Sequence, residues 1–335
     1  MLLNPCQDRL IDNYNRKLNY LRVSITDRCN LKCMYCMPKT RTWKLEHSDI
    51  LRYEEILRIV EIGVKLGISK IRVTGGEPLV RKGVGHFLKQ LSVINKIEDI
   101  SLTTNGIFLK NYMDTILDAR ISRINISLDS LEREKFKMIT GKDAFDRVWE
   151  AVMTALDKGF DPIKINVVAL KGINEDELTD FAKLSFDYPF HIRFIEHMPF
   201  KNVKIETGHG LLAPEIIKKI SRLGTLESVE NHQKDGPAAR YKFKGAKGEI
   251  GIISPISHHF CDRCNRLRLT ADGQLRPCLL SNFQKDLKTC SRTGGSDEQI
   301  KELFLEAVAG KGFEHQITAN PDSNRIDTLM SAIGG

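Results

Sequence analysis

Residues 21–38 read LRVSITDRCNLKCMYCMP, and this stretch decides how the fold is interpreted. It opens with the β-branched and apolar residues typical of a buried strand and continues into Cys29, Cys33 and Cys36, a C-x3-C-x2-C pattern. Three thiolates this close in sequence can hold one metal centre, and a [4Fe–4S] cluster with three protein ligands keeps one iron open. A closed zinc site needs a fourth ligand. The nearest histidine is His47, so a zinc knuckle is the alternative at this point.

Five further β-branched runs follow, separated by amphipathic segments of helical period such as residues 53–67 and 145–159. Six strand–helix units predict parallel strands with right-handed crossovers. Periodicity alone allows a doubly wound sheet or a barrel, and six units fall short of the eight in a complete barrel, so an open partial barrel also fits. The five runs are 71–74 (IRVT), 100–103 (ISLT), 124–128 (INISL), 163–169 (IKINVVA) and 192–195 (IRFI).

The alternation weakens after residue 195, and we expect a second, smaller domain in the remainder of the chain. Residues 229–240 (VENHQKDGPAAR) form a polar stretch typical of a loop or linker. We therefore place the two domains at residues 12–232 and 233–335.

The second part of the chain contains another group of three cysteines, Cys261, Cys264 and Cys278. His258 and His259 directly precede the group. By spacing alone, a zinc ribbon of three cysteines and one histidine competes with a second iron–sulfur centre.

The amino-acid composition of the chain indicates which class of protein it belongs to. The chain has 335 residues, of which 41% are hydrophobic and 28% charged, the balance of a globular enzyme. No apolar run approaches the roughly 18 residues of a membrane span, and the first residues lack a secretory signal pattern, so we expect a cytoplasmic protein. The net charge of +8 favours anionic partners without choosing among nucleotides, nucleic acid and an acidic membrane surface. Eight cysteines in a reducing compartment indicate metal or redox centres rather than a disulfide framework.

C-x3-C-x2-C directly after a first strand resembles the signature of the radical S-adenosylmethionine superfamily. Together, TDRCNLKCMYCMP (26–38) and CDRCNRLRLTADGQLRPCL (261–279) are similar to the GTP 3′,8-cyclases of molybdenum cofactor biosynthesis, a family of lyases. The similarity runs from about residue 10 to the end of the chain. It implies an α/β fold, an incomplete TIM-type (β/α)6 barrel, with a smaller C-terminal domain that carries a second iron–sulfur cluster.

The resemblance also implies the reaction. S-adenosylmethionine on the first cluster would yield a 5′-deoxyadenosyl radical that removes the ribose 3′ hydrogen of GTP, and the carbon radical would add to C8 of guanine. Reduction of the resulting radical would give the product, (8S)-3′,8-cyclo-7,8-dihydroguanosine 5′-triphosphate, in the first committed step of molybdopterin synthesis. Cys29, Cys33 and Cys36 would hold the first [4Fe–4S] cluster. Cys261, Cys264 and Cys278 would hold the second, whose open iron binds guanine, and this expectation outweighs zinc there.

Four residues match family positions that contact S-adenosylmethionine. Gly76 belongs to a Gly-Gly-Glu-Pro segment at the end of a predicted strand, where barrel active sites form. Alone, that segment is weak evidence, with a simple tight turn as the alternative, and each of the other matches would alone be an ordinary strand-end or loop residue. The implied contacts are Tyr35, Gly76, Ser127 and Met198.

Arginines fit a triphosphate because planar guanidinium groups bind phosphate oxygens in pairs. Arg22 alternates with apolar neighbours on the first strand, where an inward charge is costly unless it faces a ligand. Arg266 and Arg268 flank Leu267 and point to one side if extended. A lone arginine is usually solvated, but these positions match the family. The implied GTP contacts are Arg22, Arg72, Thr103, Lys164, Arg266, Leu267 through its backbone, and Arg268, with Lys70 and Arg193 as weaker candidates.

The chain ends in Gly334 and Gly335, and a terminal Gly-Gly is usually an inert end. In the family a double-glycine tail enters the active site, so the implied catalytic residues are Arg22, Arg266, Arg268, Gly334 and Gly335. The chain departs from the family at Asn15-Arg16, where Gly-Arg is common, and at residues 199–210 (PFKNVKIETGHG). Both departures concern loop geometry.

The implied partners are GTP, an electron donor such as flavodoxin or ferredoxin, and cyclic pyranopterin monophosphate synthase, which receives the product. We expect neither nucleic acid nor a membrane as a partner, and we expect a homodimer. Two alternatives remain open. A radical S-adenosylmethionine enzyme that matures a peptide would need more cysteines than the four after residue 260. A zinc-bearing nucleic-acid-binding protein would show steeply salt-dependent binding.

Overall fold

The computed structural model describes residues 9–36, 44–198, 200, 210–230, 236–315, 317 and 330–334. Gly335 and most of the divergent 199–210 stretch lie outside the described residues.

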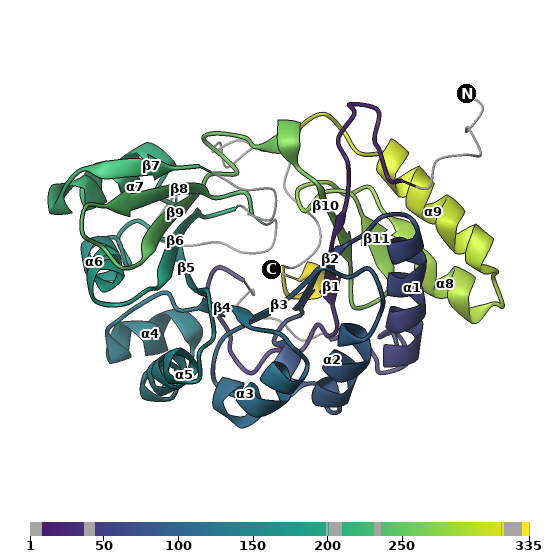
Figure 1. Ribbon diagram of the computed structural model, residues 1–335, viewed down its shortest axis with the longest axis horizontal. Coiled ribbons are helices and arrows are strands. Elements are labelled where there is room, and N and C mark those ends of the chain that lie inside the picture. Colours follow the sequence, from purple (N-terminus) through teal and green to yellow (C-terminus); the bar gives the residue numbers. More distant parts are fainter. Residues whose placement is uncertain are drawn as a thin grey trace.

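Six parallel strands, each followed by at least one helix, form the centre of the molecule (Figure 1). They are hydrogen-bonded in chain order, without the reversal that defines a doubly wound sheet. The sheet is curved and the helices lie on its outer side (Figure 1), which confirms the predicted partial barrel. The strands are β1 (Tyr20–Ser24), β2 (Lys70–Thr74), β3 (Asp99–Thr104), β4 (Arg123–Ser127), β5 (Ile163–Ala169) and β6 (His191–Glu196).

The helices form where apolar residues recur at helical spacing, and glycine follows the end of one of the predicted helices. The segment predicted over 145–159 forms α5 (Phe145–Asp157), and Gly159 follows it with φ of 78°, a left-handed conformation that suits glycine. The segment predicted over 53–67 forms α1 (Tyr53–Lys65). The other helices of this region are α2 (Val84–Ser92), α3 (Leu109–Asp118), α4 (Arg133–Thr140), α6 (Leu178–Asp187) and α7 (Ala213–Ile220).

The C-terminal part of the chain extends the same sheet at both edges. On one side β9 (Glu249–Ile253) pairs parallel with β6, and on the other β10 (Arg266–Leu269) pairs parallel with β1. Antiparallel strands complete a 12-stranded sheet whose order is β12-β11-β10-β1-β2-β3-β4-β5-β6-β9-β8-β7. The additional strands are β7 (Leu226–Val229), β8 (Ala239–Phe243), β11 (Gln274–Arg276) and β12 (Lys285–Asp286).

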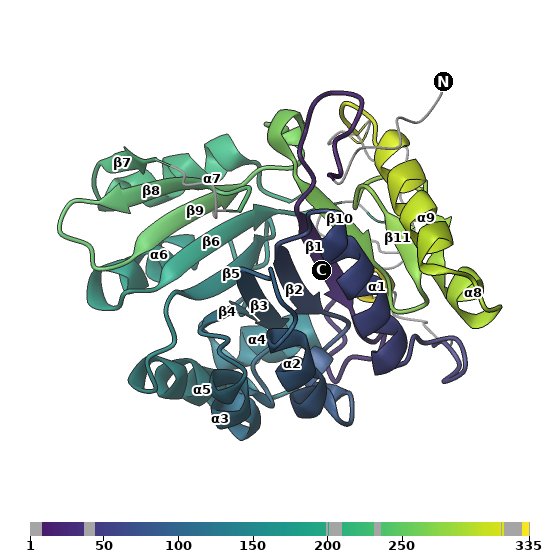
Figure 2. The same cartoon turned by 45° about the vertical axis from the view of Figure 1, so that its right-hand side comes forward.

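Two helices of the C-terminal part cover the β10 side of the sheet. α8 (Leu287–Arg292) and α9 (Asp297–Ala309) lie beside α1 in both views (Figures 1 and 2). Arg58 of α1 and Asp297 of α9 form an ion pair with 2.9 Å between Nη2 and Oδ1. None of the helices in the described part of the chain has the length and apolarity that a bilayer crossing requires.

A small apolar cluster separate from the main core lies near the second cysteine group. Phe200, Ile256, Leu280, Ile317 and Ile333 are buried in it, with Cys278 and Met330 packed against them. Ile333 belongs to the short helix α10 (Met330–Ile333). Apolar packing therefore anchors the C-terminal end of the chain inside the molecule.

Candidate active site

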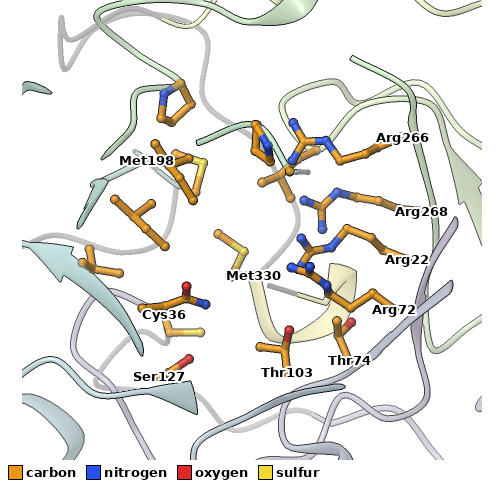
Figure 3. A pocket seen from close by; sticks show the side chains of 18 of the residues that line it. Arg22, Cys36, Arg72, Thr74, Thr103, Ser127, Met198, Arg266, Arg268 and Met330 are labelled. Carbon is orange, nitrogen blue, oxygen red and sulfur yellow. The ribbon is translucent and has the colours of Figure 1, made fainter. Parts of the chain in front are cut away.

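A cavity of about 270 Å³ opens at the carboxyl ends of the central strands, and both cysteine groups line it. Figure 3 shows Cys36 among the residues of its wall. Cys29, Cys33 and Cys36 come from the loop after β1, and we call them the first triad. Cys261, Cys264 and Cys278 come from the segment around β10 and β11, and we call them the second triad. Because β1 and β10 are neighbours, two groups far apart in sequence share one chamber.

The first triad is partly buried, and the sulfur atom of Cys29 accepts hydrogen bonds from the protein. The backbone N–H of Leu31 lies 3.4 Å from Sγ of Cys29, and Nδ2 of Asn105 lies 3.8 Å from it. Burial raises the pKa of Cys29 to about 11 and that of Cys33 well above its usual value. These thiols ionise readily only beside the positive charge of a metal centre, as thiolate ligands of a cluster do.

Gly76 allows two backbones to touch behind the first triad. Its N–H donates to the carbonyl oxygen of Thr26 at 2.7 Å, and a Cβ on Gly76 would lie 2.4 Å from the carbonyl oxygen of Arg28. The backbone of the Gly-Gly-Glu-Pro segment therefore packs directly against the backbone of the loop that carries the first triad.

Glu77 connects this segment to the next strand. Its buried carboxylate accepts hydrogen bonds from the backbone of Leu79 and Asn105 and from Oγ1 of Thr104, at 2.6–3.0 Å. Burial raises the pKa of Glu77 to about 7, although these hydrogen bonds act to lower it. The network fixes Asn105, whose amide donates to Asn30 and Cys29 of the triad loop.

Tyr35 and Asp129 form a second link between the first triad and the barrel. Oη of Tyr35 donates to Oδ2 of Asp129 at 2.6 Å, and the backbone N–H of Val168 donates to Oδ1 at 2.9 Å. Burial raises the pKa of Asp129 to about 6, despite both hydrogen bonds. The pair joins the loop of Cys33 and Cys36 to the ends of β4 and β5.

Arginines form a row across three adjacent strands on one wall of the cavity (Figure 3). Arg268 of β10 is in register with Arg22 of β1, which is in register with Arg72 of β2. Their exposed fractions are 5%, 9% and 8%. Burial lowers the pKa of Arg22 well below its usual value, and Arg268 lowers it further. Burial and neighbouring Arg266 lower the pKa of Arg268 to about 9. Cations this close are stabilised by a multiply charged anion.

The second triad lies in a cationic environment. Burial alone would raise the pKa of Cys264, but the charges of Arg266 and Lys311 outweigh it and lower the pKa to about 6. The backbone N–H of Leu280 donates to Sγ of Cys278 at 3.4 Å. The cationic surroundings therefore favour the thiolate form of Cys264, which is the form that binds a metal.

The spacing of the sulfur atoms bears on which metal centre fits. Among the described residues, His259, Cys261 and His315 are the only three such donors whose ligand atoms all lie within 4.8 Å of one another. Neither triad of described cysteines is such a group, and a structural zinc site needs four protein ligands. Sets of three thiolates fit clusters that keep one iron open.

Several buried polar atoms in the cavity wall lack a hydrogen-bond partner among the described residues. Tyr20 Oη, Thr103 Oγ1 and Asn166 Oδ1 have no hydrogen-bond partner within the described part of the chain. All three residues line the cavity. A buried polar atom without a partner is costly, so these atoms favour a polar occupant.

The structure brings most of the residues expected from the sequence into one cavity, but not all of them. Lys164 is buried in β5, and neither it nor Leu267 lines the cavity. Lys70 forms an ion pair with Asp99, with 3.3 Å between Nζ and Oδ2. Gly334 accepts a hydrogen bond from Arg268 through its carbonyl oxygen. Of the residues expected from the sequence, those that line the cavity are the two triads, Tyr35, Gly76, Ser127, Met198, Arg22, Arg72, Thr103, Arg193, Arg266 and Arg268.

The sequence analysis missed Tyr20, Asp129 and Asn166, which also line the cavity. Tyr20 and Asn166 lie within β1 and β5, and the alternation of side chains along those strands was the available signal. Asp129 follows the fourth strand run directly, at the strand end where barrel active sites form.

Comparison with known proteins agrees with this geometry. Residues 23–185 match the model of the radical SAM superfamily, and residues 190–317 match the Molybdenum Cofactor Synthesis C model. The crystal structure of Streptococcus suis SuiB bound to S-adenosylmethionine has a TM-score of 0.59 at 13% identity, over 82% of this chain. The chain spans 64% of the length of SuiB. This likeness supports the fold alone.

Curated relatives match nearly the whole chain. A GTP 3′,8-cyclase of Moorella thermoacetica is 45% identical over 97% of this chain and 99% of its own length. Those of Petrotoga mobilis and Thermodesulfovibrio yellowstonii are 46% and 47% identical, over 97% of this chain and 100% and 99% of their own lengths.

The fold is a partial barrel, with a cysteine triad directly after its first strand and Gly-Gly-Glu-Pro after its second. These features define a radical S-adenosylmethionine enzyme. Within that class, the chain belongs to the GTP 3′,8-cyclase family. Membership confirms the predicted activity in molybdenum cofactor biosynthesis. It also confirms the predicted cofactors, S-adenosylmethionine and two [4Fe–4S] clusters.

Proposed function

We propose that GTP binds in the shared cavity with its triphosphate on the arginine row. The observation that carries the proposal is the register of Arg268, Arg22 and Arg72 on three adjacent strands, at a wall between the two triads. Neighbouring strands lie about 4.8 Å apart, so the three guanidinium groups match successive phosphate groups. Thr103 and Arg266 add polar contacts from the same cavity.

The first triad holds the cluster that binds S-adenosylmethionine. Four residues from different segments of the barrel line the same cavity and are the proposed contacts of S-adenosylmethionine: Tyr35, Gly76, Ser127 and Met198. Tyr35 and Gly76 belong to the networks that fix the triad loop, so their contacts with the cofactor are made from rigid positions. When bound, the cluster and S-adenosylmethionine supply the one-electron chemistry that starts the reaction.

The second triad holds the cluster whose open iron takes the guanine base. Support comes from the lowered pKa of Cys264 and from the cavity that the second triad shares with the arginine row. Guanine at the second triad and phosphates on the arginine row would hold the ribose toward the first triad. Orientation of this kind contributes most of what the protein itself adds to the reaction.

Gly334 and Gly335 complete the substrate site from the C-terminal end. The hydrogen bond from Arg268 to Gly334 supports this role. Lys164 and the backbone of Leu267 remain GTP contacts on family resemblance alone, since neither lines the cavity. Lys70 and Arg193 are further candidates, and only Arg193 lines the cavity.

The remaining assignments are proposals of the same kind. The chain acts in the cytoplasm, possesses functional units at 12–232 and 233–335, and forms a homodimer. It receives electrons from a flavodoxin or ferredoxin and passes its product to cyclic pyranopterin monophosphate synthase.

The test is an anaerobic assay of the reconstituted, reduced protein with S-adenosylmethionine. Formation of 5′-deoxyadenosine is measured with GTP, with ATP and without nucleotide. Stimulation by GTP alone, with loss of the 3′ hydrogen of GTP to 5′-deoxyadenosine, is the expected result. Formation that is indifferent to GTP contradicts the proposed substrate site, and no formation by a fully loaded protein contradicts the site of the first cluster.

A further inference from the structure

Lys311 places a buried cation against the second triad, and neither the family motif nor the proposed substrate site includes it. It follows α9, and only 4% of its surface is exposed. Its Nζ donates to the carbonyl oxygen of Arg266 at 3.1 Å, to that of Pro277, and to Sγ of Cys264 at 3.8 Å. An ammonium has three donors, so each of them has an acceptor here.

The three acceptors lie on both segments that carry the triad. Arg266 comes two residues after Cys264, and Pro277 directly precedes Cys278. One ammonium group therefore ties the Cys264 segment to the Cys278 segment. None of the three acceptors is a carboxylate, so Cys264, as a ligand of the cluster, would supply the only formal negative charge among them. A buried cation is costly unless a negative charge lies beside it.

Arg16 fixes the backbone on which Lys311 is mounted. Its guanidinium donates to the carbonyl oxygens of Gly312 at 2.7 Å, Phe313 at 2.8 Å and Cys261 at 2.6 Å. Asp12 holds this guanidinium through a buried ion pair of 2.6 Å. Arg16 thereby attaches the segment after α9 to Cys261, the remaining cysteine of the triad, which leaves Lys311 little freedom to move away.

We infer that Lys311 is a positioning residue of the second cluster, which holds the two triad segments at fixed separation and stabilises the reduced cluster through its charge and its N–H···S contact. The inference rests on the proposal that the second triad holds a cluster. Reduction adds one electron to the cluster, and a nearby cation favours the state with more negative charge. Hydrogen bonds to the sulfurs act in the same direction.

The experiment isolates the second cluster in the full-length chain. Cys29, Cys33 and Cys36 are all replaced by serine, and the reconstituted protein is titrated with dithionite while the reduced cluster is followed by electron paramagnetic resonance. Lys311→Met, Lys311→Arg and Lys301→Met are made in this background. Lys301 is the matched control, because it lies on α9 and pairs with Glu298 on the surface at 2.7 Å.

Lys311→Met is expected to shift the midpoint potential of the second cluster to a more negative value, with Lys311→Arg shifted less and Lys301→Met unchanged. An unchanged potential in Lys311→Met, or an equal shift in Lys301→Met, overturns the inference. If the methionine variant assembles no cluster, the arginine variant decides: a cluster near the parental potential supports the inference, and no cluster overturns it. Absence of iron in the parental background overturns the cluster assignment itself and the inference with it.

Discussion

The guanidinium of Arg268 donates a hydrogen bond to the carbonyl oxygen of Gly334, which attaches the end of the chain to the arginine row. Gly334 has φ of 84°, and a Cβ there would lie 2.3 Å from Oγ1 of Thr74 and 3.0 Å from Cβ of Ser24. The tail therefore occupies a space that admits glycine alone. Any side chain at this position moves the tail away from Arg268.

Gly334→Ala should reduce cyclisation of GTP by roughly 100-fold, the usual cost of misplacing a contact by about 1 Å. Cleavage of S-adenosylmethionine should continue, because the first triad is untouched. Product and 5′-deoxyadenosine are measured in the same reaction. Gly312→Ala is the control, since a Cβ there meets only the carbonyl oxygen of Glu314, at 3.4 Å. Equal loss in both variants would contradict a specific role for the tail.

Arg266→Ala should lower the rate of cyclisation by about 10- to 100-fold, which corresponds to the loss of hydrogen bonds to a charged group. Uncoupled cleavage of S-adenosylmethionine should persist. Arg263→Ala changes the same loop at an exposed side chain (75% exposed) and should behave as the parent. Unchanged product formation in Arg266→Ala would remove this residue from the substrate site.

Cys29→Ser should halve the iron content per chain and abolish formation of 5′-deoxyadenosine, because the second triad retains its own cluster. Iron, sulfide and the nucleoside are measured after anaerobic reconstitution. Cys290→Ser replaces a cysteine of α8 outside both triads and should change neither quantity. Retained cleavage in Cys29→Ser would contradict the assignment of the first triad.

Tyr35→Phe should destabilise the chain by about 1–3 kcal/mol, because the buried carboxylate of Asp129 loses one of its two donors. Tyr53→Phe removes a hydroxyl that donates to the carbonyl oxygen of Lys82 at an exposed site, at 3.2 Å, and should cost much less. Urea unfolding of the metal-free proteins measures both. Equal costs would show that the Tyr35–Asp129 pair contributes nothing beyond a surface hydrogen bond.

Because His197 is shielded from water, we expect the free energy of unfolding to depend on pH. Burial lowers its pKa to about 4, and Nε2 has no partner in the described part of the chain. His197 has its ordinary pKa of about 6.5 in the unfolded chain. Below that pH the unfolded chain binds a proton at His197, and the folded chain does not bind it until the pH approaches 4. Stability is therefore lost as pH falls from about 6.5 toward 4, by at most about 1.4 kcal/mol per pH unit.

His197→Phe should flatten this dependence in urea unfolding of the metal-free protein between about pH 5 and pH 7. It should also leave stability near neutral pH unchanged or raised, since an unpaired buried nitrogen is removed. His86→Phe, at an exposed position of α2, should keep the parental slope. An identical slope in His197→Phe would show that this residue is not the one excluded from protonation.

Local pattern was enough to predict the six central strands and both cysteine triads. Residues 21–26 and 163–169 are β-branched runs bounded by breaks in the pattern, and each forms a strand within two residues of the expected bounds. Cys29, Cys33 and Cys36 are close in sequence, so their proximity in space needs no long-range information.

Relationships that depend on distant pairing were not visible in the sequence. Nothing local indicates that Arg268 pairs in register with Arg22, because this register depends on β10 lying beside β1. Single residues such as Arg16 and Lys311 have no motif, and their importance follows only from the carbonyl and sulfur atoms around them. Lys164 is the reverse case, because family resemblance implies a contact with GTP while the residue does not line the cavity, so that contact stays a prediction.

The pairing of β1 with β10 also affects how the chain is made. A ribosome releases β1 long before Arg266 is added, at about 5–20 residues per second, so the barrel's first strand waits on the order of tens of seconds for its outer neighbour. During that interval β1, buried on both faces in the finished molecule, presents an open edge of the kind that promotes aggregation. Nascent chains that stop before β10 should therefore depend on chaperones, and the part of the cavity wall that β10 contributes forms only after its residues have been added.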